Sequence, residues 1–120
     1  MKIALKNVDL SVHNVARSLE FYTLVLDMTD TPDSAPPQML ILSAGSVTLS
    51  LHQTGTQGGR PVQPGSVELA FQCDDLEVAH ARFLSFGLEA GEVTQYGFGS
   101  NFEARDPDGY AISVYTLRED

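Results

Sequence analysis

The sequence of 120 residues has little cysteine, little positive charge and no long apolar run. Its lone cysteine, Cys73, cannot form a disulfide within the chain, which fits a reducing compartment, so we expect a cytoplasmic protein. No apolar run approaches the roughly 18 residues that a membrane-spanning helix needs. Met1-Lys2-Ile3 leads directly into a strand pattern, so we expect neither a signal peptide nor a membrane partner.

Basic residues number 7 against 16 acidic ones, which gives a formal net charge of −9. This balance argues against nucleic acid or an anionic membrane as a partner, and it allows a cationic ligand. The three histidines, His13, His52 and His80, have neither HxH nor HExxH spacing and therefore form no metal-binding motif.

The clearest local signal is the segment Asp106-Pro107-Asp108-Gly109, whose residue types are typical of a tight turn. Apolar and polar residues alternate over 101–105 before the turn and over 111–115 after it. The pattern predicts a hairpin with one face on a core and the other facing more polar surroundings.

An internal repeat organises the rest of the chain. Asn7 and Glu68 open two alternating strand patterns, and the helix caps Asn14 and Asp75 follow at the same offset of 61 residues (68 − 7 and 75 − 14). We predict an α+β fold of two βαβββ modules that form a curved mixed sheet around a central groove, with the helices outside. Residues 1–120 then form one domain, with module one at about 1–53, a linker at about 54–66 and module two at about 67–120.

The chain resembles the vicinal oxygen chelate superfamily, which includes glyoxalase I, bleomycin-resistance proteins and extradiol dioxygenases. The matching stretches are Arg17-Ser18-Leu19-Glu20-Phe21-Tyr22 followed by Val25-Leu26, and Asp106-Pro107-Asp108-Gly109 followed by Ile112-Ser113-Val114. The resemblance covers nearly the whole chain and implies the fold, but the fold hosts many functions. It also implies a homodimer, often with a groove built from both chains.

In enzymes of this superfamily, two positions in each module hold a divalent metal. The resemblance places these positions at Asn7, Ser50, Glu68 and Ser113. Only Glu68 is a usual ligand type, because neutral serines bind such metals poorly. We therefore expect no metal and no other cofactor.

Polar and aromatic side chains are expected to line the groove. Glu68 is the central candidate because a carboxylate in mid-strand needs a partner, a ligand or water. Ligand contact is expected from Asn7, Asp9, Ser50, His52, Glu68, Phe98, Glu103, Arg105, Ser113 and Tyr115. The Gly-flanked aromatics Tyr96 and Phe98 are expected to form a pliable loop beside the groove.

The favoured interpretation is a metal-independent protein that binds a small organic molecule, as the bleomycin-resistance branch does. The hypothesis for the guest is a flat, cationic or weakly basic aromatic compound, because acidic groups and aromatic rings are both predicted at the groove. The alternative is a glyoxalase-like or dioxygenase-like enzyme, with lyase or epimerase chemistry and a divergent site. A metal-dependent form would use His52 and Glu68 in a rearranged site, whereas a metal-free form would use Glu68 as a base. A third reading is a module that only binds a partner protein.

Overall fold

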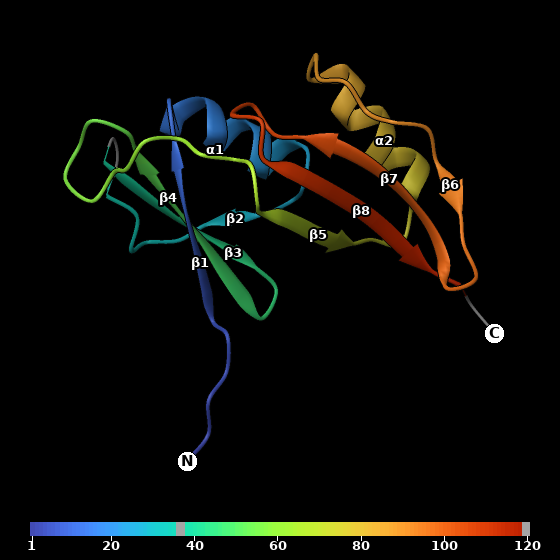
Figure 1. The fold of residues 1–120 in the computed structure, drawn as a ribbon, viewed down its shortest axis with the longest axis horizontal. Helices are drawn as coiled ribbons and strands as arrows, with labels where there is room; N and C mark the ends of the chain where they lie inside the picture. Colours follow the sequence, from blue (N-terminus) through green and yellow to red (C-terminus); the bar gives the residue numbers. More distant parts are fainter. Residues whose placement is uncertain (36–37, 119–120) are drawn as a thin grey trace. The chain divides into compact units, whose positions relative to one another are not determined.

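The computed structural model describes residues 1–35 and 38–118. The chain divides into two compact units, Met1–Gln63 and Pro64–Asp120, and each is described by itself. The division lies inside the segment expected to be a linker. The elements are, in order, β1 (Asn7–Val12), α1 (Val15–Leu24), β2 (Thr29–Asp30), β3 (Met39–Ala44), β4 (Val47–Gln53), β5 (Glu68–Gln72), α2 (Leu76–Ser85), β6 (Thr94–Gln95), β7 (Gly99–Arg105) and β8 (Ala111–Leu117) (Figure 1).

Unit 1 consists of one sheet with a helix on one face (Figure 1). The strand order is β1-β4-β3-β2, with β1 parallel to β4 and the other neighbours antiparallel. The α1 helix begins after Asn14 because the Asn14 side chain accepts a hydrogen bond from the Arg17 backbone N–H at 3.2 Å. The alternate apolar residues of the strands form a buried core with the helix: Leu10, Val12, Leu40, Leu42, Leu49, Leu51, Val15, Phe21, Tyr22 and Val25.

Unit 2 repeats this arrangement with the strand order β5-β8-β7-β6, and α2 packs against β7 and β8. The helix is again capped by an acceptor side chain, since Asp75 accepts from the Val78 backbone N–H at 3.2 Å. Phe83 of the helix meets Phe102 of β7 edge to face at 5.4 Å between ring centroids. The two helices begin 61 residues apart, as the repeat predicts. Each unit is thus a strand, a helix and three strands, which confirms the α+β fold.

The predicted hairpin at the end of the chain is also confirmed. Asp106 is 3% exposed, and its carboxylate accepts hydrogen bonds from the backbone N–H groups of Asp108 and Tyr110, both at 2.9 Å. Gly109 has a φ of 92°, a conformation that side-chain-bearing residues rarely adopt. These two residues therefore fix the connection that brings β7 beside β8.

The segment 89–95 contains little regular strand. Only Thr94 and Gln95 form a strand, and Ala90 makes an isolated bridge with Ala104. The preceding Gly87 ends α2 with a φ of 90° and turns the chain toward β7. Within the described residues, no helix is long and apolar enough to cross a bilayer.

Replacing Asp106 tests how much the closing turn stabilises the fold. Asp106→Ala removes the acceptor for two backbone donors and should lower the free energy of unfolding by about 2 kcal/mol, measured by urea denaturation. The matched control is Asp74→Ala at an exposed aspartate beside the α2 cap. Equal small losses for both variants would contradict the role assigned to Asp106.

Candidate functional site

The strand register of unit 2 places three rows of side chains on the face opposite α2. Glu68, Ala111 and Arg105 are paired across β5, β8 and β7 and form the first row. Side chains two residues apart share a face, so the next rows follow at alternate positions. They are Ala70, Ser113 and Glu103, then Gln72, Tyr115 and Asn101.

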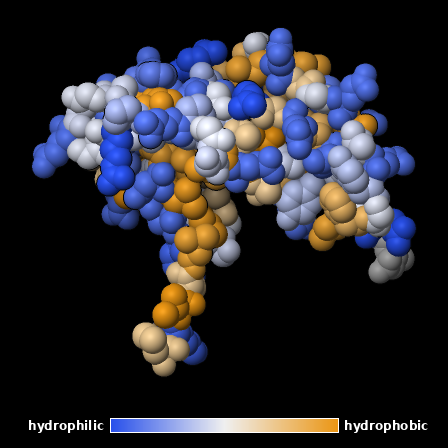
Figure 2. Space-filling view, viewed as in Figure 1, coloured by the Kyte–Doolittle hydropathy of each residue, from blue (hydrophilic) through white to orange (hydrophobic). Residues whose placement is uncertain are grey.

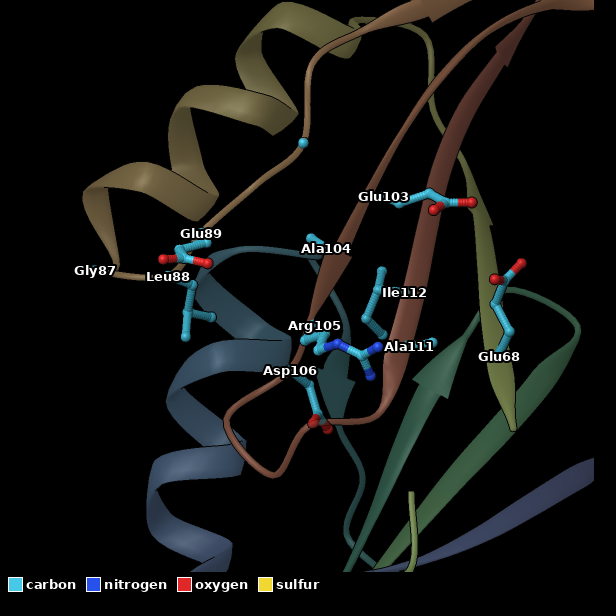
Figure 3. A pocket seen from close by; sticks show the side chains of 11 residues that line it. Glu68, Gly87, Leu88, Glu89, Glu103, Ala104, Arg105, Asp106, Ala111 and Ile112 are labelled. Atoms are coloured by element: carbon cyan, nitrogen blue, oxygen red, sulfur yellow. The ribbon is translucent and has the colours of Figure 1, made fainter. Parts of the chain in front are cut away.

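A pocket of about 480 Å³ lies at the end of this sheet where β7 finishes and β8 begins (Figure 3). The loop that follows α2 supplies Leu88 and Glu89 to one side of it. Its volume falls within the usual range for small-molecule sites. The remaining lining residues are Glu68, Gly87, Gly91, Glu103, Ala104, Arg105, Asp106, Ala111 and Ile112.

The pocket is lined by negatively charged side chains that are not engaged in ion pairs or side-chain hydrogen bonds within the described residues. Glu68 and Glu103 are exposed and project to the same side of the sheet (Figure 3). Within the described residues, no side-chain hydrogen bond or ion pair engages Glu68, Glu89 or Glu103. These three carboxylates face one lining cation, Arg105, so this group of four has a net formal charge of −2.

Two charged residues of the pocket already have structural roles. The Asp106 carboxylate is occupied by the backbone of the turn, as described above. The Arg105 guanidinium donates from Nη1 to the Gly109 carbonyl at 2.8 Å, which holds it over the same turn. Arg105 and Glu68 lie on either side of β8, separated by about two strand spacings, or ~10 Å. Within the described residues, Arg105 and Glu68 therefore form no ion pair.

On the equivalent face of unit 1, the polar side chains form hydrogen bonds with one another. The amide oxygen of Asn7 accepts from the hydroxyls of Thr48 at 2.6 Å and Ser50 at 2.8 Å. The Asn7 amide nitrogen donates to Asp9 at 3.0 Å, and His52 Nε2 lies 3.4 Å from the same Asp9 oxygen. The structure thus brings four predicted site residues of module one together, but in a network in which each has a partner within the unit.

The donors at the four metal positions of the superfamily do not fit a divalent metal. The amide oxygen of Asn7 is already occupied by two hydroxyl groups. Ser50 and Ser113 are neutral and buried, at 5% and 8% exposure. Glu68 is the single carboxylate among the four. Across residues 1–35 and 38–118, no three His, Cys, Asp or Glu side chains gather in a way that could hold a metal ion.

Tyr115 and Phe98 occupy different places relative to the pocket. Tyr115 lies on the polar face of β8, and its hydroxyl donates to Gln72 at 3.4 Å. Phe98 stacks on Tyr96 at 5.3 Å between ring centroids, and both rings are about half exposed. They precede β7, whose opposite end carries Arg105, about 20 Å away along the strand. The aromatic loop therefore lies at the end of β7 far from the pocket.

Sequence analysis missed the pocket wall formed by Leu88 and Glu89. Both residues directly follow Gly87 in the sequence. The available signal was Gly87 itself, since a glycine that ends a helix reverses the chain and sends the next residues back over the sheet. A hydrogen bond from the Gly91 N–H to the Glu103 carbonyl at 2.8 Å then fixes this wall beside β7.

The free cysteine, Cys73, is half-buried and directly follows β5. Burial raises the pKa of its thiol, and the nearby carboxylates of Asp74 and Asp75 act in the same direction, against a lowering by the Asp75 backbone. A raised pKa keeps the thiol protonated at neutral pH. Cys73 therefore lacks the thiolate character of a catalytic nucleophile.

Comparison with known proteins identifies the family. The family model for the Glyoxalase/Bleomycin resistance protein/Dioxygenase superfamily matches residues 4–114. No significant match was found among curated proteins.

Three solved structures are similar over nearly their full length. An integron cassette protein from V. cholerae has 29% sequence identity and a TM-score of 0.75, with 98% of each chain covered. TnmS3, an antibiotic binding protein from Streptomyces sp. CB03234, has 20% identity and a TM-score of 0.79, with 98% of this chain and 99% of that one covered. Lactoylglutathione lyase from Agrobacterium tumefaciens has 17% identity and a TM-score of 0.74, with 97% and 95% covered. With the family model matching most of its length, the chain belongs to the Glyoxalase/Bleomycin resistance protein/Dioxygenase superfamily.

Proposed function

We propose that this protein binds a small, positively charged organic molecule that carries an aromatic ring, and that it does so without a metal. The observation that carries the proposal is a set of three carboxylates that line one pocket, Glu68, Glu89 and Glu103. Among the described residues, none of the three has a partner side chain. A cationic guest would supply the partner that these groups lack.

Electrostatics favours a cation both at contact and at a distance. The pocket group of three glutamates and Arg105 has a net charge of −2, and the whole chain has a formal charge of −9. A surface of one sign steers ligands of the opposite sign and raises their local concentration. An anionic guest would have to pair with Arg105 against these carboxylates.

The apolar side of the pocket suits an aromatic or similarly flat group. Leu88 and Ala104, both partly exposed, offer carbon surface next to the charged residues. A longer guest that extends along the polar face of β8 would pass Ser113 and reach Tyr115, whose ring can stack on it or make a cation–π contact. The side chains of Ala70, Ala111 and Ser113 are small and project little above the sheet, which leaves room for such a guest on this face.

The structural relatives are consistent with a binding role on this fold. TnmS3 is described as an antibiotic binding protein, whereas another relative is a lactoylglutathione lyase. Because the fold hosts both kinds of protein, the residues of the site must decide. The poor metal donors Asn7, Ser50 and Ser113 favour binding over metal-dependent catalysis.

The first test is a thermal-shift screen with matched compounds. Cationic aromatics should raise the melting temperature, while neutral and anionic analogues of the same ring should raise it less. At 100 times the dissociation constant, binding stabilises the fold by about 2.7 kcal/mol, which is readily detected. If anionic thioesters or glutathione conjugates give the shift and cationic aromatics do not, the binding proposal fails and an enzyme that uses Glu68 and His52 becomes the better explanation.

The second test removes one charge from the pocket. Glu68→Gln keeps the shape of the side chain, so it should weaken binding of a cationic aromatic about tenfold and reduce the salt dependence of the affinity, measured by titration calorimetry. The control is Glu20→Gln on the exposed surface of α1, which changes the net charge equally. Equal affinities for the two variants would remove Glu68 from the site.

The third test concerns metal. Protein purified without added metal salts should hold well under one Ni, Zn, Mn or Fe per chain by elemental analysis, because only one of the four superfamily positions is a carboxylate. A chelator should leave the melting temperature unchanged, since no tightly bound ion is removed. About one metal per chain, lost in Glu68→Ala, would reverse the ranking of binding protein and enzyme.

A further inference from the structure

The loop after α2 forms one wall of the pocket, and it is anchored at both of its ends. The wall segment is defined here as residues 87–91, of which all but Ala90 line the pocket. At its start, the Leu88 N–H donates to the Phe83 carbonyl of α2 at 3.1 Å. At its end, Gly91 is hydrogen-bonded through both of its backbone groups. The path of the segment between Leu88 and Gly91 therefore depends on both anchors.

Gly91 connects the wall segment to both a helix and a strand of unit 2. Its N–H donates to the Glu103 carbonyl of β7 at 2.8 Å, and its carbonyl oxygen lies 2.9 Å from Nε2 of His80 on α2. A carbonyl can only accept, so the Nε2 atom carries the proton of this bond. A Cβ atom at Gly91 would lie 3.1 Å from the Glu103 carbonyl oxygen, which is a very close contact. The absence of a side chain thus allows the close approach to β7.

Packing holds the His80 ring in the orientation that this bond needs. The side chain is half-buried, and its ring meets Phe102 of β7 edge to face at 5.0 Å between ring centroids. Phe83, which lies one helical turn after His80, meets the same Phe102 ring edge to face. Phe102 is 1% exposed, so its own ring is held by the core. Aromatic contacts of this kind favour one ring orientation, and the His80 Nε2–H therefore points at Gly91 with little loss of side-chain entropy on bonding.

The position of Glu89 depends on these backbone anchors. Glu89 lies between Leu88 and Gly91 in the sequence, and Figure 3 shows it with Leu88 on the loop after α2. Its exposed carboxylate has no partner side chain among the described residues. In the same part of the chain, His80 provides the single side-chain hydrogen bond to the wall segment. Loss of this bond would release the end of the segment that carries one of the three pocket carboxylates.

We propose that His80 is a positioning residue for the pocket. Its Nε2–H ties Gly91 to α2 and thereby fixes where Leu88 and Glu89 stand around a guest. His80 does not itself line the pocket, so it acts through the wall segment. The effect of His80 on guest affinity rests on the proposed function, whereas its effect on the order of the wall segment does not.

Amide hydrogen exchange, followed by NMR without any guest, tests the order of the wall segment. His80→Leu should speed exchange of the Gly91 amide at least about tenfold, because the segment opens more often. The Cys73 amide, which donates to the Tyr115 carbonyl of β8, reports general loosening of unit 2 and should change much less. His80→Gln should restore slow exchange at Gly91, because its amide nitrogen can donate to the same carbonyl.

The matched control is Ala81→Leu, which places a leucine at the next, exposed position of α2. Exposed apolar side chains already lie among polar ones on the surface over this helix (Figure 2), so the control should leave both amides unchanged. Should His80→Leu fail to fold, His80→Phe keeps an aromatic ring beside Phe102 and removes the donor.

The effect on the pocket is measured by titration with proflavine, a flat aromatic cation whose fluorescence reports binding. His80→Leu should weaken its binding about fivefold, since one hydrogen bond no longer orders the wall, and His80→Gln should restore it. If the natural chain does not bind proflavine, this result counts against the proposed function, and the exchange of Gly91 still decides the role of His80.

Three results would overturn the proposal. Equal acceleration of exchange at Gly91 and Cys73 in His80→Leu would mean that His80 only stabilises unit 2 as a whole. Unchanged exchange at Gly91, or a failure of His80→Gln to restore it, would mean that the Nε2–H bond does not hold the wall. Faster exchange at Gly91 with unchanged proflavine affinity would mean that the order of the wall does not matter to the guest.

Discussion

The parallel pairing of the first and last strands in each unit determines which side chains meet. Because β1 lies beside β4 and β5 beside β8, residues far apart in sequence become neighbours: Asp9 with Ser50, and Ala70 with Ser113. The helix between the two strands makes this parallel arrangement possible, since parallel strands need a long crossover connection. Its buried face then covers one side of the sheet and leaves the other side for polar chemistry. The core, the polar faces and the pocket at the start of β8 all depend on this pairing.

The two polar faces have the same geometry and opposite character. In unit 1, Asn7 satisfies its neighbours, and the network of hydrogen bonds leaves little for a ligand to add. In unit 2, the equivalent position is Glu68, an acidic side chain that lines the pocket and has no partner side chain in the part of the chain that the structure describes. The residue at this one register position, asparagine in unit 1 and glutamate in unit 2, therefore distinguishes the two faces. The first face is internally hydrogen-bonded, and the second carries a negative charge that can attract a cation. This contrast makes unit 2 the better candidate for ligand recognition.

The sequence predicted the fold far better than the site, for physical reasons. Caps, alternation and turn residues act over a few positions, so Asn14, Asp75 and Gly109 could be assigned from local pattern alone. The identity of the polar face followed from the same alternation, which placed Glu68, Glu103 and Arg105 correctly on one side. The pocket wall did not follow, because the position of Leu88 depends on the path of the chain after Gly87. The position of Phe98 depends on the length of β7, because Phe98 precedes the first residue of this strand and Arg105 is its last residue.

The alternation of polar and core faces along the same strands has an evolutionary consequence. Substitutions at positions 68, 70, 103 or 113 change the polar face without touching the apolar residues that hold each helix to its sheet. Specificity can therefore drift through single substitutions while the fold persists. A one-residue insertion or deletion within β5 or β8 is different, since it would exchange the two faces downstream and carry charge into the core. The lineage of such a protein should accept replacements freely on these strands and length changes only in the loops between them.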